Sequence, residues 1–140
     1  MGVRSRGRRA LLQSRFAAEI NRRPLPDNME SMRDLLKDNE LGIGVPLEIE
    51  DWVWVTDLGR IVQHNREEID SRIEEVMKNW TLKRLNIVTR LILEQALAEM
   101  DYFAPPTPAA VAIDEAIELA KAFDSDEAAS FVNGILDKLK

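Results

Sequence analysis

Hydrophobic residues along the chain recur at intervals of three, four and seven positions, the spacing that puts side chains on one face of an α-helix. Leu12, Phe16 and Ile20 form the first such stripe. The pattern predicts helices over about residues 8–20, 28–39, 47–78 with a break between 59 and 67, 85–100, 108–123 and 128–139. The run Trp52–Val55 is too short for a convincing strand and has no partner strand. We therefore expect an all-α bundle of six to seven helices.

Turn-forming and capping residues mark the ends of these segments. Residues 42–46, with two glycines and a proline, predict a loop. Thr107 is positioned as an N-cap with Pro108 as the first helical residue. Asp124 and Glu127 have the spacing of a capping box before the last helix.

The segment 85–100 is apolar around most of the helical wheel, which predicts a central, buried helix. On its polar strip, Arg90 and Glu94 are one turn apart and can pair. Gly7 is expected to delay the first helix. We therefore predict one domain over residues 1–140, with a flexible arginine-rich arm at 1–7.

The amino-acid composition excludes most of the common kinds of catalytic site. A chain of 140 residues suits one domain, and it contains no cysteine and a single histidine, His64. Thiolate nucleophiles, cysteine zinc sites and histidine-based triads are therefore excluded. No apolar run approaches the length of a membrane span. We expect a cytoplasmic, non-enzymatic protein with no catalytic residues, no metal site, no cofactor and no membrane partner.

Charge is divided unevenly along the chain. Residues 1–23 contain seven arginines and one acidic residue, Glu19, for a net +6, whereas the remaining residues have a net charge of -12. Arginine matches phosphate with its planar guanidinium and also stacks on bases, which favours nucleic-acid binding. A solvated basic leader and an arginine-rich targeting peptide remain open alternatives.

Two C-terminal segments carry a resemblance to a known family. VAIDEAIELAK at 111–121 and FVNGILDK at 131–138 resemble the C-terminal signature of the NusB family of bacterial transcription antitermination factors. WTLKRL at 80–85 is similar to the middle segment of the family, and the first helix around residues 8–16 is similar to its arginine-rich first helix.

The resemblance implies two small helical sub-bundles, at residues 8–78 and 79–140, and an antitermination factor without enzymatic activity. It implies binding to single-stranded boxA RNA of nascent ribosomal RNA transcripts, together with the ribosomal protein NusE, in the RNA polymerase elongation complex with other Nus factors. A homodimer is left open. The implied RNA contacts are Arg4, Arg6, Arg8, Arg9, Gln13, Phe16, Lys121, Glu127 and Phe131.

Two other functions fit the same pattern. The chain could be a helical interaction module that kept the NusB-like fold without RNA binding. It could also be the NusB-like accessory domain of a ribosomal RNA methyltransferase, although a glycine-rich cofactor segment and a cysteine nucleophile are absent. Thr89, Glu94 and Ala98 depart from residues common in the family, in a region linked to NusE contact.

Several candidate residues also have a purely structural interpretation. Phe16 and Phe131 lie on apolar stripes, so core packing is as good an interpretation as base stacking. Asn133 and Gly134 inside the last helix favour a packing requirement. Lys121 lies where it would complement the C-terminal end of a helix dipole.

Overall fold

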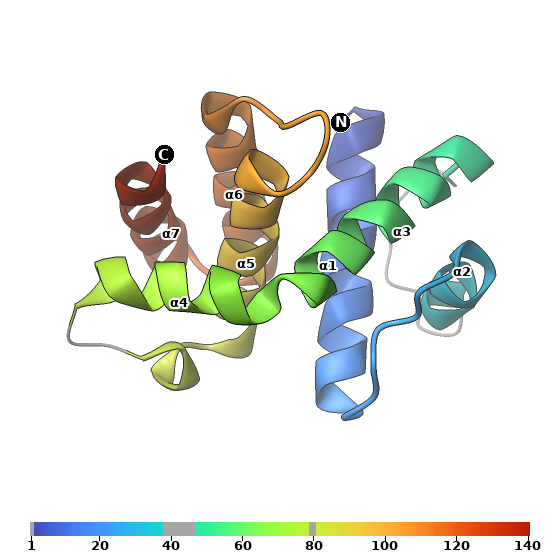
Figure 1. Ribbon diagram of the computed structural model, residues 1–140, viewed down its shortest axis with the longest axis horizontal. Helices are drawn as coiled ribbons and strands as arrows, with labels where there is room; N and C mark the ends of the chain where they lie inside the picture. Colours follow the sequence, from blue (N-terminus) through green and yellow to red (C-terminus); the bar gives the residue numbers. More distant parts are fainter. Residues whose placement is uncertain (1, 38–46, 79–80) are drawn as a thin grey trace. The chain divides into compact units, whose positions relative to one another are not determined.

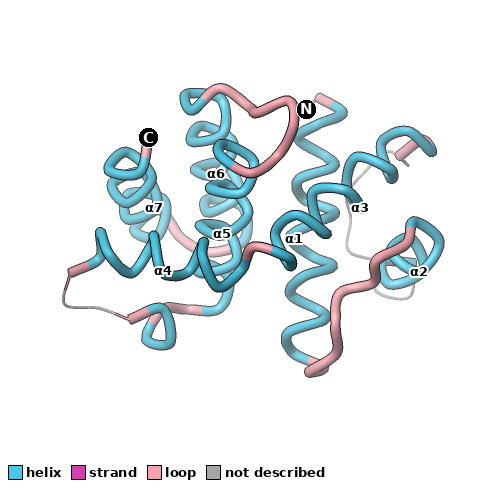
Figure 2. Tube along the Cα trace, viewed as in Figure 1, coloured by secondary structure: helices cyan, strands magenta, loops and turns pink. Residues whose placement is uncertain are grey.

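The structure, a computed structural model, describes residues 2–37, 47–78 and 81–140. These residues form seven α-helices and one 3-10 turn, and no strand occurs among them (Figures 1 and 2). The elements are α1 (Val3–Ile20), α2 (Met29–Lys37), α3 (Ile49–His64), α4 (Arg66–Met77), η1 (Leu82–Arg84), α5 (Ile87–Asp101), α6 (Ala109–Phe123) and α7 (Asp126–Leu139). The all-α prediction is confirmed, while the loop predicted at 42–46 lies outside the described residues.

The helices form two compact units, Met1–Gln63 and His64–Lys140. The division coincides with the interruption at Asn65 between α3 and α4, inside the interval where the sequence predicts a break. The predicted boundary between the two sub-bundles, after residue 78, differs from this division, because it groups α4 with the first three helices. In the structure α4 packs against α5 and α7, because its apolar residues Ile69 and Ile73 are buried in the second unit.

In the first unit, α1 begins at Val3, so the flexible arm expected at residues 1–7 is wrong. Gly7 lies within the helix and packs against α3. A Cβ atom built on Gly7 would lie 3.2 Å from both Cε3 and Cζ3 of Trp54. Glycine costs an α-helix about 1 kcal/mol relative to alanine. Here it lets an aromatic ring approach the helix backbone, so tertiary packing overrides the local preference.

The second unit is built around α5, which lies against α4, α6 and α7 (Figure 1). Its residues from Leu91 to Met100 are all buried, as the apolar wheel predicts. Asn86 caps its first turn by accepting a hydrogen bond of 2.8 Å from the Val88 N–H group. Although α5 is largely apolar, neither it nor any other helix among the described residues is both long and apolar enough to cross a membrane.

Two predicted helix caps are replaced by others in the structure. Thr107 does not cap α6, because its hydroxyl group donates a hydrogen bond of 2.6 Å to the buried Glu99 carboxylate, and Pro108 occupies the N-cap position. Ser125, rather than Asp124, caps α7 by accepting a hydrogen bond of 3.0 Å from the Ala128 N–H group. In both cases the side chain predicted to cap the helix has another partner in the second unit: Glu99 for Thr107, and Thr89 for Asp124.

Candidate nucleic-acid interface

Four of the candidate residues form one row along α1. Arg6, Arg9, Gln13 and Phe16 follow one another at steps of three, four and three residues, which places them on one side of the helix. At 100° per residue, this row lies on the side of α1 opposite Leu11. The Phe16 residue is 38% exposed, so part of it is accessible at the surface of the first unit. The row therefore combines two cations, an amide and an exposed aromatic ring.

Gln13 is the most buried member of this row. Its residue is 8% exposed, and its Oε1 atom is buried without a hydrogen-bond partner. A buried acceptor without a donor costs free energy, of the order of 1–3 kcal/mol. Because this oxygen atom is itself inaccessible to solvent, a ligand can reach it only if the Gln13 side chain changes its conformation.

Arg4 and Arg8 form a second row, on the side of α1 that faces α3. The guanidinium carbon of Arg4 lies 4.7 Å from the centroid of the Trp54 ring, and that of Arg8 lies 5.5 Å from it. Both distances are within the range of cation–π interactions. The two arginines differ in accessibility, since Arg4 is exposed and Arg8 is only 6% exposed.

The remaining three candidates lie in the second unit, where α6 ends and α7 begins. Lys121 is exposed in the last turn of α6, with its Nζ atom 4.0 Å from Glu118 Oε1. Glu127 is exposed in the first turn of α7, and Phe131 is half-buried one turn later on the same side. The hydroxyl group of Thr89 donates a hydrogen bond to the Asp124 carboxylate, which fixes the α6–α7 connection to α5. The nine candidates thus fall into two groups, each held within one unit.

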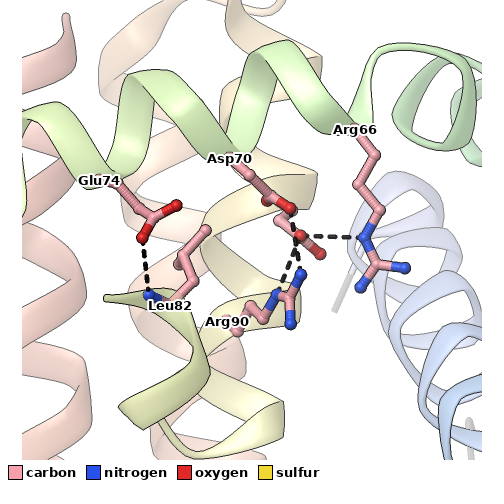
Figure 3. Close-up of polar contacts among 6 residues, drawn as sticks. Arg66, Asp70, Glu74, Leu82 and Arg90 are labelled. Carbon is pink, nitrogen blue, oxygen red and sulfur yellow. Dashed lines mark hydrogen bonds and ion pairs between the residues drawn. The ribbon is translucent and has the colours of Figure 1, made fainter. Parts of the chain in front are cut away.

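A partly buried ion cluster joins α4 to α5 in the second unit (Figure 3). The predicted pair of Arg90 and Glu94 is confirmed, with Arg90 Nε 3.3 Å from Glu94 Oε2. Two residues of α4 extend it: Arg66 Nε lies 3.0 Å from Glu94 Oε2, and Arg90 Nη2 lies 3.1 Å from Asp70 Oδ2. Sequence reasoning missed Arg66 and Asp70, because they are 28 and 20 residues away from their partners in the chain.

One carboxyl group in this cluster, that of Asp70, has a raised pKa. Burial raises the pKa of Asp70 to about 7, and the hydrogen bond and negative charge of Glu94 contribute to the rise, whereas Arg90 opposes it. A perturbed carboxyl group can mark a catalytic site, but ion-pair networks perturb pKa values as well. Two arginines and two acids make this cluster an ion-pair network between helices. Over the described parts of the chain, acidic and histidine side chains form no group of three that could hold a metal ion.

The chain is similar to known proteins over almost its whole length. The sequence profile of the NusB family matches residues 5–140. The chain is 35% identical over 140 residues to the transcription antitermination protein NusB of Solibacter usitatus, covering 100% of this chain and 90% of that protein. It is 31% identical to the protein of that name from Clostridium botulinum, covering 97% and 98%. Among solved structures, T. maritima NusB superposes with a TM-score of 0.79 at 30% identity, covering 97% of this chain and 89% of that one.

Proposed function

The chain belongs to the NusB family, and we propose that it acts by binding the boxA element of nascent RNA along α1. Membership makes it a transcription antitermination factor and not an enzyme. Two features of the chain support the proposal: the arginine-rich helix α1 and the acidic character of the remaining residues.

The observation that carries this proposal is the row of Arg6, Arg9, Gln13 and Phe16 on α1. Proteins bind single-stranded RNA with cations along the phosphates and with flat side chains on which unstacked bases lie. Arg6 and Arg9 supply the cations, and Phe16 supplies an exposed ring two to three turns further along the helix. An apolar ring that is 38% exposed at the end of an arginine row suits base stacking better than core packing.

In the second unit, Lys121 and Phe131 contribute a further cation and a further ring to RNA binding. Phe131 is half-buried, so part of this residue is accessible to a ligand. Glu127 is exposed in the first turn of α7, four residues before Phe131. Its negative charge weakens phosphate binding nearby, so in this proposal it limits affinity and favours contacts with base edges.

The partner in this proposal is NusE, a ribosomal protein, and the assembly acts on the RNA polymerase elongation complex in the cytoplasm. Outside residues 1–23 the chain has a net charge of -12, which repels RNA and attracts a basic protein. The main phosphate contacts therefore lie on the basic helix, Lys121 adds a local one in the second unit, and the acidic remainder is available to the partner. Thr89, Glu94 and Ala98 are all buried, so their departures from common family residues alter internal packing and not a directly exposed contact surface.

Fluorescence anisotropy tests this proposal. The fluorescein-labelled probes are a short boxA-type RNA and a scrambled RNA of the same composition, each titrated with the chain alone and with the chain plus NusE. We expect tighter binding of the boxA-type probe, and tighter binding still with NusE. Equal, weak binding of both probes under all conditions would support an interaction module that lacks RNA binding.

A further inference from the structure

Trp54 contacts two of the candidate arginines, Arg4 and Arg8. The RNA contacts proposed above for α1 assign no role to the Trp54 ring. We propose that Trp54 is a positioning residue that holds the Arg4 guanidinium in place for a phosphate group of single-stranded RNA. This inference rests on the proposed function, since it concerns how the RNA-binding side chains are arranged.

The position of the Trp54 ring is fixed by its contact with α1. The ring edge lies so close to Gly7 that a Cβ atom there would be 3.2 Å from two ring carbons. Arg4 and Arg8 are three residues before and one residue after Gly7, so both side chains lie along the same side of the helix as the ring. Gly7, with Arg4 and Arg8 on either side of it in the sequence, thus forms the surface of α1 against which the indole packs.

The two arginines have different roles in this arrangement. Arg8 is 6% exposed, so it is enclosed near the ring and helps to hold it. Arg4 is exposed and lies closer to the ring centroid, at 4.7 Å. Of these two guanidinium groups, that of Arg4 is therefore the one that a phosphate can reach.

Stacking on an aromatic ring prepares an arginine for phosphate binding without occupying its donors. When an aromatic ring contacts the flat face of a guanidinium group, the N–H donors point outward in the plane of that group and stay available. An arginine that is already ordered loses less rotamer freedom when it binds. Removing the ring leaves the charge of Arg4 in the protein but lets the side chain move, which should weaken RNA binding modestly.

A double-mutant cycle on the full chain tests the role of Trp54. The variants are Trp54→Leu, Arg4→Ala and the two combined, each titrated by anisotropy with the fluorescein-labelled boxA-type RNA. Trp54→Leu should weaken binding about two- to fivefold, the factor expected from an exposed cation–π contact. In the Arg4→Ala background the same substitution should change affinity by less than the experimental error. Val53→Ala, at the neighbouring exposed position of α3, is the control and should leave affinity unchanged.

The outcomes separate this inference from the function on which it rests. If the unmodified chain does not prefer the boxA-type probe, the proposed function fails and this inference fails with it. If the unmodified chain binds but Trp54→Leu has no effect, or has the same effect with and without Arg4, the positioning role is wrong and RNA binding stands. Should Trp54→Leu lose its helical circular dichroism signal, Trp54→Phe is used in the same cycle. It keeps a smaller ring and should weaken binding by a smaller factor that also depends on Arg4.

Discussion

Arg66 donates a hydrogen bond from its Nε atom to Glu94 Oε2 at 3.0 Å, and this ion pair joins α4 to α5. The Glu94 carboxylate is 0% exposed, so its charge depends on Arg66 and Arg90 for compensation. In this chain the buried acid is accommodated because two arginines converge on one of its oxygens.

Replacing Glu94 with alanine should lower the free energy of unfolding by about 1–3 kcal/mol, since it removes the acidic partner of Arg66 and one of the two acids paired with Arg90. Urea unfolding followed by circular dichroism measures this change. The control is Glu118→Ala, because Glu118 is 70% exposed and 4.0 Å from Lys121. That variant should change stability by less than about 0.5 kcal/mol. Similar small losses for both variants would contradict a stabilising role for the cluster.

Stability should depend on pH through Asp70. Burial and the neighbouring Glu94 raise the pKa of Asp70 from its ordinary value of 3.8 to about 7 in the folded chain. Between these values the folded state holds a proton that the unfolded state has lost. The contribution of Asp70 is therefore fully present below about pH 4 and is lost as the pH rises through 7. One proton accounts for a slope of at most about 1.4 kcal/mol per pH unit.

Urea unfolding at several pH values between 4 and 8 isolates this contribution when the chain is compared with Asp70→Asn. The difference in stability between the two should change in favour of the Asn variant as the pH rises. A difference that stays constant over this range would show that Asp70 titrates normally.

The glycines of α1 and α7 should respond in opposite ways to alanine. A Cβ atom at Gly134 would meet nothing within 4 Å, so Gly134→Ala should raise the free energy of unfolding by about 0.5–1 kcal/mol through helix propensity. At Gly7 the new methyl group would press on Trp54 at 3.2 Å, so Gly7→Ala should stabilise less or destabilise. Thermal melting of the two variants in parallel makes the comparison, with each serving as the control of the other. Equal stabilisation by both would mean that Trp54 moves aside freely.

Helix positions were largely predictable from the sequence, because the apolar spacing that forms a helix is local. The apolar face of α5 and the pairing of Arg90 with Glu94 follow from neighbours within four residues. The break between α3 and α4 was predictable for the same reason.

What sequence reasoning missed depends on residues distant in the chain. Gly7 indicated a late helix start, but Trp54 packs against it and the helix extends back to Val3. Thr107 has the character of an N-cap, but Glu99 provides it with a stronger partner. Close packing does not require glycine at position 134, because a Cβ atom there would have no heavy atom within 4 Å among the described residues, apart from its chain neighbours and its own helix backbone.

The candidate site was predictable as a set of residue types but not as an arrangement. Spacing alone puts Arg6 and Arg9 on one side of α1, yet it could not show that Arg8 is almost fully buried. Neither could it show that Phe16 is exposed, since an aromatic residue on an apolar stripe usually packs in the core.

Removing both cations of the α1 row should change the salt dependence of RNA binding. Each phosphate contact on a single strand contributes about 0.7 to the slope of log K against log salt. Arg6→Ala combined with Arg9→Ala should therefore reduce the slope by about 1.4 and the affinity by about tenfold or more. Anisotropy titrations at several salt concentrations measure both quantities.

The matched control for this pair is Arg33→Ala combined with Arg84→Ala, which removes two arginines from other elements. It should leave most of the slope and affinity intact. Equal losses in both double variants would indicate attraction by net charge alone and not by the α1 row.

The most direct test of RNA binding along α1 is a nuclear magnetic resonance titration of the isotope-labelled chain with the boxA-type RNA. Backbone amide resonances of residues 3–20 should shift in proportion to bound RNA, with the largest changes near Arg6, Arg9 and Phe16. Amides of residues 91–100 of α5, which are buried, should shift little. Saturating RNA that leaves the resonances of α1 unmoved would contradict the proposal.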